Sequence, residues 1–116
     1  MGKESKIKNE GELIAFMILQ RDGFSILETN WHFQNDEVDI IAEKKEALIF
    51  IHVKARTNKK ALKPSKSIDA KKIAIYKDAA KEYLIQKPSK LEIRFDTLNV
   101  IIGKDETEIE HITNAF

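Results

Sequence analysis

The chain has 116 residues, of which 42% are hydrophobic and 34% charged, and it contains no cysteine. This composition is typical of one folded domain spanning 1–116 and excludes a disordered tail. The longest apolar run, Leu13 to Leu19, is far shorter than the roughly 20 residues that span a bilayer. No secretory cleavage site is present, and without cysteine there is no disulfide, thiolate zinc site or cysteine nucleophile. We therefore expect a cytoplasmic protein without a membrane segment.

Positive charge is concentrated in the middle of the chain. Residues 54–77 contain nine basic side chains and one acidic side chain, a local net charge of +8, whereas the whole chain carries +1. A basic side of this strength binds polyanions. A solvated lysine-rich loop explains the same charge equally well.

The first predicted element is a helix that begins at Ile7 or Lys8 and ends at Arg21. Asp22-Gly23 follows it as a C-terminal cap would. The centre of this helix, residues 13–19, is apolar on every face, so we expect cover on more than one side. A sheet would cover one side and a loop, a helix or the second subunit of a homodimer the other.

Three strands are predicted next, over residues 24–31, 37–43 and 47–54. The short link at 44–46 makes the second and third a hairpin. The third strand is apolar on both faces, which indicates a central strand.

The second half of the chain begins with a basic loop over 57–66 that contains Pro64. Ser67 is a suitable N-cap for a helix from Ile68 to about Gln86. A strand over 91–102, a turn and a strand over 107–112 complete the chain. The order α-β-β-β-α-β-β predicts an α/β fold with a mixed central sheet flanked by helices.

Polar side chains occupy the two central strands where a buried sheet should be apolar. Asp39 lies between Val38 and Ile40, and His52 and Lys54 share one strand face. If the two strands pair antiparallel, Asp39 approaches His52. Such groups are costly to bury unless they pair or bind something, so either a functional site or a buried ion network is expected.

The spacing of Asp39, His52 and Lys54 resembles the signature of the PD-(D/E)XK nuclease superfamily. In that signature two acidic residues bind a divalent metal and the lysine helps activate water. Several blocks make the resemblance more specific, because in order and content they are similar to the YraN-like family of uncharacterised bacterial proteins. These blocks are Gly11-Glu12, Asn30-Trp31, residues 37–42, residues 50–56, Arg94-Phe95-Asp96 and residues 110–116.

The resemblance implies a restriction-endonuclease-like three-layer fold related to Holliday-junction resolvases. It also implies branched or duplex DNA as substrate, catalysis by Asp39, His52 and Lys54, and Mg²⁺ or Mn²⁺ held by Asp39, His52 and Glu12. The chain departs from the family at His52, where the pattern has Glu. Imidazole suits Zn²⁺, Ni²⁺ or Mn²⁺ better than Mg²⁺, so we expect weakened Mg²⁺ binding. A core histidine and an Asp39–Lys54 ion pair are the structural alternatives.

Basic residues close to Lys54 are the candidate contacts to nucleic acid. Contacts to the phosphate backbone position DNA without reading its sequence. The predicted contacts are Arg56, Lys59, Lys60, Lys63, Lys71 and Lys72. By contrast, we expect Arg94, Asp96 and His111 to be structural, and the aromatic residues Trp31 and Phe33 to belong to the core or to an interface. Three functions stay open: a metal-dependent endonuclease, an inactive DNA-binding module and a protein-interaction domain.

Overall fold

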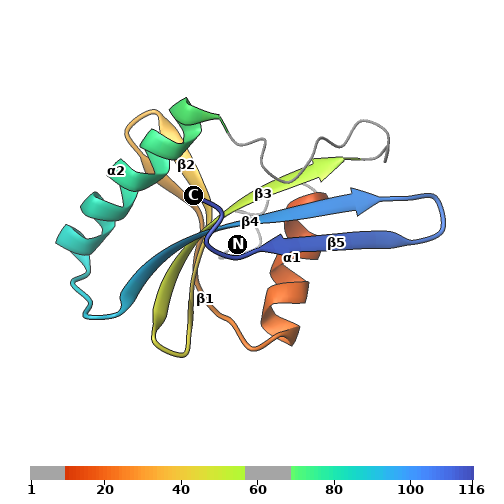
Figure 1. Cartoon of the computed structure of the whole chain (residues 1–116), viewed down its shortest axis with the longest axis horizontal. Helices are drawn as coiled ribbons and strands as arrows, with labels where there is room; N and C mark the ends of the chain where they lie inside the picture. The colour runs from red at the N-terminus through yellow and green to blue at the C-terminus, as the bar shows by residue number, and fades with distance from the viewer. Residues whose placement is uncertain (1–9, 57–68) are drawn as a thin grey trace, which may run out of the picture.

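The computed structural model describes residues 10–56 and 69–116. Five strands form one sheet in the order β1-β2-β3-β4-β5, and the two helices lie on its opposite faces (Figure 1). The predicted order and three-layer α/β architecture are confirmed. The elements are α1 (Glu10–Arg21), β1 (Ser25–Phe33), β2 (Asp36–Lys44), β3 (Ala47–Arg56), α2 (Ala70–Gln86), β4 (Glu92–Ile102) and β5 (Thr107–Ile112).

The first helix ends as its sequence predicts. Gly23 has φ +93°, a left-handed conformation that glycine adopts without a Cβ clash. The N–H of Phe24 donates to the Leu19 carbonyl at 2.9 Å and that of Gly23 donates to Gln20 at 3.1 Å. These two bonds form a Schellman cap, which turns the chain from α1 into β1.

The sheet combines hairpins with one crossover. β1, β2 and β3 pair antiparallel in sequence order, which confirms the predicted hairpin between β2 and β3. β4 pairs parallel with β3, and β5 pairs antiparallel with β4. The connection from β3 to β4 runs through α2, as a parallel pair requires.

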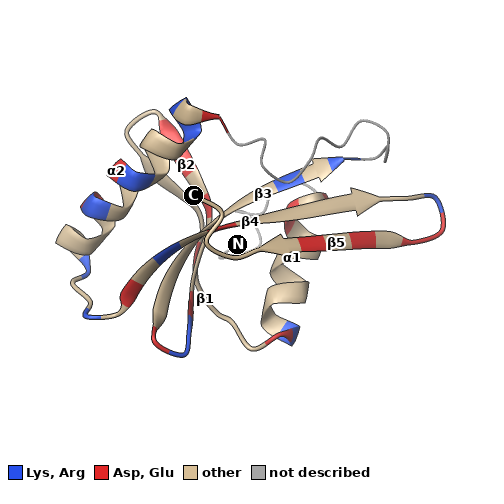
Figure 2. Cartoon of the chain, viewed as in Figure 1, with Lys and Arg blue, Asp and Glu red and all other residues tan. Residues whose placement is uncertain are grey.

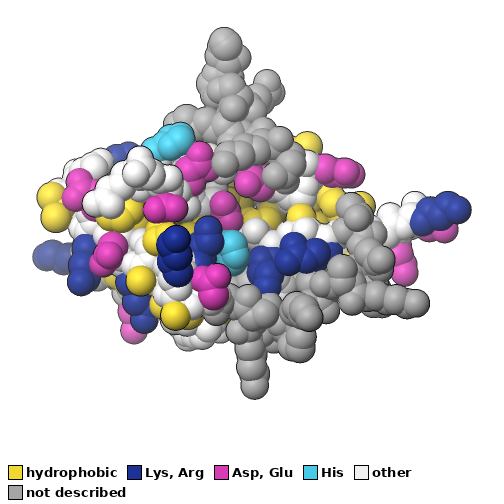
Figure 3. Space-filling view, turned by 90° about the horizontal axis from the view of Figure 1, so that it is seen from above, with side chains coloured by type: hydrophobic (Ala, Val, Ile, Leu, Met, Phe, Trp, Pro, Cys, Tyr) yellow, Lys and Arg dark blue, Asp and Glu magenta, His cyan; other side chains and the backbone are white. Residues whose placement is uncertain are grey.

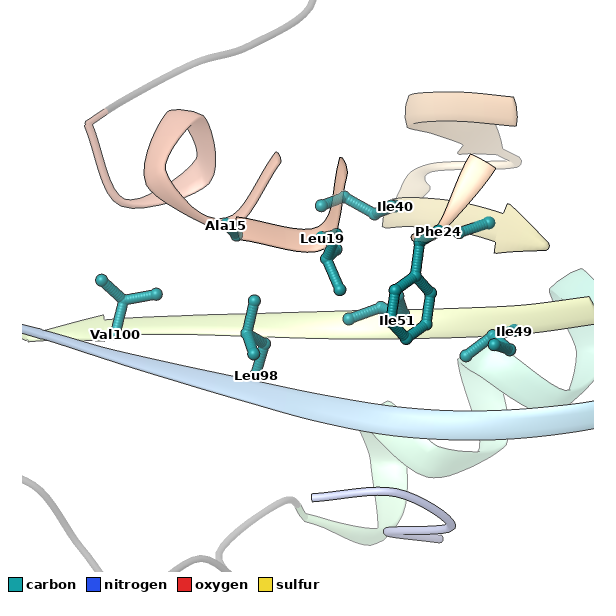
Figure 4. Close-up of a cluster of buried hydrophobic side chains, with 9 residues drawn as sticks. Ala15, Leu19, Phe24, Ile40, Ile49, Ile51, Leu98 and Val100 are labelled. Carbon is teal, nitrogen blue, oxygen red and sulfur yellow. The ribbon is translucent and has the colours of Figure 1, made fainter. Parts of the chain in front are cut away.

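One hydrophobic core lies between α1 and the sheet (Figure 4). Ala15 and Leu19 of α1 face Ile49 and Ile51 of β3 and Leu98 of β4, and all five are fully buried. The opposite face of α1 is different, because Leu13 is 46% and Met17 59% exposed. The sheet covers one side of α1, as predicted. Cover of the other side by a loop, a helix or a second subunit stays a prediction.

A second core lies between α2 and the other sheet face. Its aromatic rings pack edge to face, with Tyr83 against Trp31 at 5.2 Å and against Phe50 at 5.8 Å. Trp31 and Phe33 pack against this cluster, which confirms the core alternative for these aromatic residues. The buried members are Val38, Ile41, Leu48, Phe50, Tyr76, Ala79, Ala80 and Tyr83. With apolar side chains in both cores, β3 is the buried central strand that its sequence predicts.

The start of α2 differs from the prediction. Its N-cap is Asp69, whose Oδ1 accepts a hydrogen bond from the Lys72 backbone N–H at 2.8 Å. A carboxylate at this position also complements the helix dipole. The predicted cap Ser67 lies outside the described residues, as does the predicted start of α1 before Glu10. Within residues 10–56 and 69–116, neither helix is long and apolar enough to cross a bilayer.

Candidate functional site

The sheet opens between β2 and β3 at Asp39. The ladder between these strands runs from Lys44↔Ala47 to Ile40↔Ile51 and stops there, although both strands continue. Val38 packs in the α2-side core and Ile40 in the α1-side core, so the normal alternation of a strand breaks at Asp39. Backbone groups beyond the break need partners other than the facing strand.

Side chains supply those partners. The Asp39 backbone N–H donates to the Tyr76 hydroxyl at 3.0 Å, and the Val53 backbone N–H donates to Asp39 Oδ2 at 2.8 Å. The Tyr76 hydroxyl in turn donates to the Ile51 carbonyl at 3.4 Å. Asp39 is therefore held both by its backbone and by its carboxylate.

The predicted approach of Asp39 to His52 is confirmed. His52 Nδ1 lies 3.3 Å from Asp39 Oδ2, and the two side chains are 16% and 19% exposed respectively. With an ionised carboxylate and a neutral imidazole, this contact places the ring proton on Nδ1, which donates to Oδ2, and leaves Nε2 as the acceptor nitrogen. The contact thus fixes both the orientation and the tautomer of the imidazole.

Polar residues continue from β3 across β4 to β5. His52 and Lys54 lie beside Thr97 and Asn99 in the parallel register, and Asn99 lies opposite Glu110. Asn99 Nδ2 donates to Glu110 Oε1 at 3.0 Å, which leaves its Oδ1 as an acceptor. Thr97 Oγ1 and Asn99 Oδ1 are buried without a hydrogen-bond partner in the described part of the chain. This polar row is unusual, because buried polar atoms are normally paired.

Cations adjoin this row at the end of β3. Lys54 and Arg56 point to the same strand face, and Arg56 donates to the Ala55 carbonyl at 3.1 Å. Partial burial, together with the charge of Arg56, lowers the pKa of Lys54. Lys and Arg side chains also occur along α2, whereas acidic side chains occur along β5 (Figure 2). In Figure 3 basic side chains lie on both sides of a histidine.

Glu12 lies close to the site, at the start of α1. It lines a cavity of about 380 Å³ together with Val53, Ala55 and Arg56. Its charge also contributes to the raised pKa of Tyr76, whose hydroxyl contacts Asp39. The structure therefore brings Asp39 and His52 together and places Glu12 at the neighbouring end of α1.

The donor set does not fit a complete Mg²⁺ site. No group of three His, Asp or Glu residues that could hold a metal occurs in residues 10–56 and 69–116. Asp39 Oδ2 already accepts from Val53 and lies beside His52. Asp39 and His52 together offer a single carboxylate, and the imidazole suits a transition-metal ion better than Mg²⁺.

Of the other residues predicted to contact nucleic acid, two lie within the described residues and three lie outside them. Lys71 and Lys72 lie in the first turn of α2, with Lys71 exposed and Lys72 half-buried. Lys59, Lys60 and Lys63 lie outside the described residues.

Comparison with known proteins identifies the family. The model of the uncharacterised protein family UPF0102 matches residues 11–100. The chain belongs to UPF0102. It is 39% identical to a UPF0102 protein of Flavobacterium psychrophilum over 116 residues, which are 100% of this chain and 98% of the relative. It is 36% identical to one from Parabacteroides distasonis, over 100% of this chain and 96% of that protein. The predicted YraN-like membership is thereby confirmed.

The UPF0102 match includes Glu12, Asp39, His52, Lys54 and Asn99. The curated relatives from Flavobacterium and Parabacteroides extend over residues 110–116 as well. The alignments with these two relatives therefore cover the segment that follows β5.

A second polar cluster in this UPF0102 protein is structural. Asp96 is fully buried. Its two carboxylate oxygens accept hydrogen bonds from the Arg94 guanidinium, from Nε at 3.0 Å and from Nη2 at 2.9 Å. It also contacts His111 Nε2 at 2.8 Å and accepts from the Asn114 backbone N–H at 3.1 Å. These partners hold the pKa of Asp96 below its usual value despite burial. The predicted structural role of Arg94, Asp96 and His111 is confirmed, since they anchor the segment after β5.

Sequence reasoning missed three residues of the site. Tyr76 is part of the apolar stripe of its helix. That pattern does not distinguish a tyrosine whose hydroxyl forms hydrogen bonds to a site from one whose ring only packs in the core. Thr97 and Asn99 carry a signal, because they alternate with Leu98 and Val100 and so place two polar groups on one strand face.

Proposed function

We propose that this UPF0102 protein binds DNA, branched or duplex, through the phosphate backbone and without reading its sequence. The observation that carries the proposal is the position of Lys54 and Arg56. Both residues lie on β3 beyond the last pair of the β2–β3 ladder, after His52 and on the same strand face as His52. Two cations beside a break in the sheet form a point where a polyanion gains charge-assisted hydrogen bonds.

Binding variants test this proposal. We expect replacement of Lys54 and Arg56 by glutamine to weaken binding to a fluorescent duplex and to a four-way junction by about tenfold, because two solvent-screened ion pairs to phosphate at about 0.7 kcal/mol each add up to about 1.4 kcal/mol. The matched control replaces Lys45 and Lys90, exposed lysines away from the site, by glutamine. An equal loss in both double variants, or no binding by the native chain, would overturn the proposal and leave a protein-interaction domain as the better explanation.

A second candidate function is phosphodiester hydrolysis at the same place. The contact between Asp39 and His52 favours it, because a carboxylate that fixes the Nδ1–H tautomer leaves Nε2 free to accept a proton from water. Lys54 on the same face is placed to stabilise negative charge that develops on phosphate oxygens. In this step the water oxygen bonds to phosphorus while the bond from phosphorus to a sugar oxygen breaks. The water proton passes to His52 Nε2, and the Lys54 ammonium supplies a proton to the leaving sugar oxygen.

The assay for hydrolysis compares four-way-junction, flap and linear DNA with Mg²⁺, with Mn²⁺ and with a chelator. Native protein that cleaves, and Asp39→Ala protein that does not, would establish hydrolysis at this site. Cleavage only by His52→Glu would indicate a binding protein whose nuclease site lacks one carboxylate. Absence of cleavage by all three would contradict the second function and leave the first untouched.

A further inference from the structure

We infer that Tyr76 is a positioning residue, which fixes Asp39 and His52 in one geometry, and that Phe116 holds Tyr76 in place. The inference rests on the proposed function, since it gives the Asp39–His52 pair its working arrangement. Tyr76 lies outside the sequence blocks that indicated the site, and Phe116 is the last residue of the final block.

Tyr76 fills the gap where the ladder between β2 and β3 ends. Its hydroxyl accepts from the Asp39 backbone N–H on β2 and donates to the Ile51 carbonyl on β3. One side-chain oxygen thereby joins the two strands where their backbones no longer bond to each other. Because Ile51 directly precedes His52, this bridge sets the distance between the backbones that carry the two site residues.

The ring of Tyr76 acts on the site as well. It packs edge to face against the His52 imidazole, with centroids 5.8 Å apart and an interplanar angle of 76°. Tyr76 thus contacts Asp39 through its hydroxyl and His52 through its ring. A rotation of the tyrosine would disturb both residues together.

The hydroxyl stays protonated at every physiological pH. Tyr76 is fully buried, and burial together with the negative charge of Asp39 raises its pKa well above the ordinary value. A neutral hydroxyl both accepts from Asp39 and donates to Ile51, whereas a phenolate could do only the first. The bridge therefore keeps both of its hydrogen bonds across the physiological pH range.

Phe116 packs edge to face against the tyrosine ring. Its ring lies 5.8 Å from Tyr76 at 73° and 5.3 Å from Phe95. The chain leading to it is fixed, because the Ala115 N–H donates to the Phe95 carbonyl at 2.7 Å and the Asn114 N–H to Asp96. The buried Asp96 cluster is thus connected to the candidate site through Phe116 and Tyr76.

The test is NMR spectroscopy of the His52 ring in native, Tyr76→Phe, Phe116→Leu and Tyr83→Phe proteins. Tyr76→Phe removes one oxygen and keeps the ring. Tyr83→Phe is the matched control, because it makes the same change on the same helix, where the hydroxyl contacts Glu28 at 3.3 Å. Long-range ¹H–¹⁵N spectra report the ratio of the Nδ1–H to the Nε2–H tautomer, which a merely structural tyrosine would leave unchanged.

We expect Tyr76→Phe to lower that ratio by about fivefold, the factor that one hydrogen bond of ordinary net strength supplies. Phe116→Leu should change it in the same direction and by less, and Tyr83→Phe should leave it unchanged. An unchanged ratio in Tyr76→Phe, or an equal change in Tyr83→Phe, would overturn the inference. DNA binding by native protein is measured separately, so failure of the proposed function and failure of the positioning role give different results.

Discussion

The carboxylate of Asp39 accepts the Val53 backbone N–H at 2.8 Å and so takes the place of a backbone carbonyl between two neighbouring strands. The site residue on β2 is therefore attached to the strand that carries His52 and Lys54. Any movement of β3 carries the carboxylate with it. This attachment explains how a chain of 116 residues keeps charged groups aligned at the point where its sheet opens.

The bond between Asp39 and Val53 predicts a difference between two substitutions. Asp39→Ala leaves the half-buried Val53 N–H without its acceptor and should lower the free energy of unfolding by about 1–3 kcal/mol. Asp39→Asn keeps an acceptor oxygen and should cost less. Urea denaturation followed by circular dichroism measures both. Equal losses would show that the hydrogen bond contributes nothing.

The buried Asp96 predicts a dependence of stability on pH. Its pKa in the folded protein lies below its usual value of 3.8, so its stabilisation is present above about pH 4 and is lost as pH falls through the folded pKa. Asp96→Asn should remove this part of the pH dependence. Because it also leaves the Arg94 guanidinium without its carboxylate, it should destabilise the protein at pH 7 by about 3–5 kcal/mol.

The matched control for Asp96 is Asp105→Asn, which changes an exposed carboxylate in the turn between β4 and β5. Urea titrations at pH 7 and pH 3 compare the two variants. A native-like pH profile in Asp96→Asn would contradict the assignment.

The two tyrosines predict the behaviour of the protein at high pH. Burial, followed by the charge of Glu28, raises the pKa of Tyr83 to about 12, and the pKa of Tyr76 is also raised well above 10.0. Ultraviolet absorbance should therefore show little tyrosinate at pH 10.5 until urea unfolds the chain. Since the unfolded tyrosines ionise first, stability should fall as pH rises above about 10. Half-ionisation near pH 10 in native buffer would contradict both assignments.

Substitution of His52 by glutamate predicts a gain of metal binding. A second carboxylate beside Asp39 supplies the oxygen ligand that Mg²⁺ prefers. We expect Mg²⁺ to raise the melting temperature of His52→Glu protein, since a ligand at 100 times its Kd stabilises by about 2.7 kcal/mol. The control is His52→Gln, because glutamine has the same side-chain length as glutamate but no charge. No difference between the two variants would show that these positions do not form a metal site.

Much of the fold follows from local patterns in the sequence. Alternating apolar residues located the strands, and Asp22-Gly23 located the end of α1, because these signals depend only on neighbouring residues. The hairpin link at 44–46 set the register that brings Asp39 to His52. The predicted N-cap of α2, Ser67, was wrong, because Ser67 and Asp69 are both suitable caps and the structure uses Asp69.

The rest of the site depends on packing between distant elements. The Tyr76 hydroxyl reaches Asp39 across 37 residues, a contact that no local pattern reports. The exposure of Met17 has the same cause, because only the finished sheet determines how much of α1 it covers. Asn99 was within reach of sequence reasoning, but its pairing with Glu110 required the β4–β5 register.

The most direct test of the central claim is the salt dependence of DNA binding. For duplex DNA, log K falls with log salt concentration with a slope of about −0.9 for each phosphate contacted. Fluorescence anisotropy across a range of salt concentrations gives this slope for the native chain and for the Lys54→Gln, Arg56→Gln double variant. The account predicts a slope about 1.8 units shallower in the double variant and no change in the Lys45→Gln, Lys90→Gln control. Identical slopes in all three proteins would contradict it.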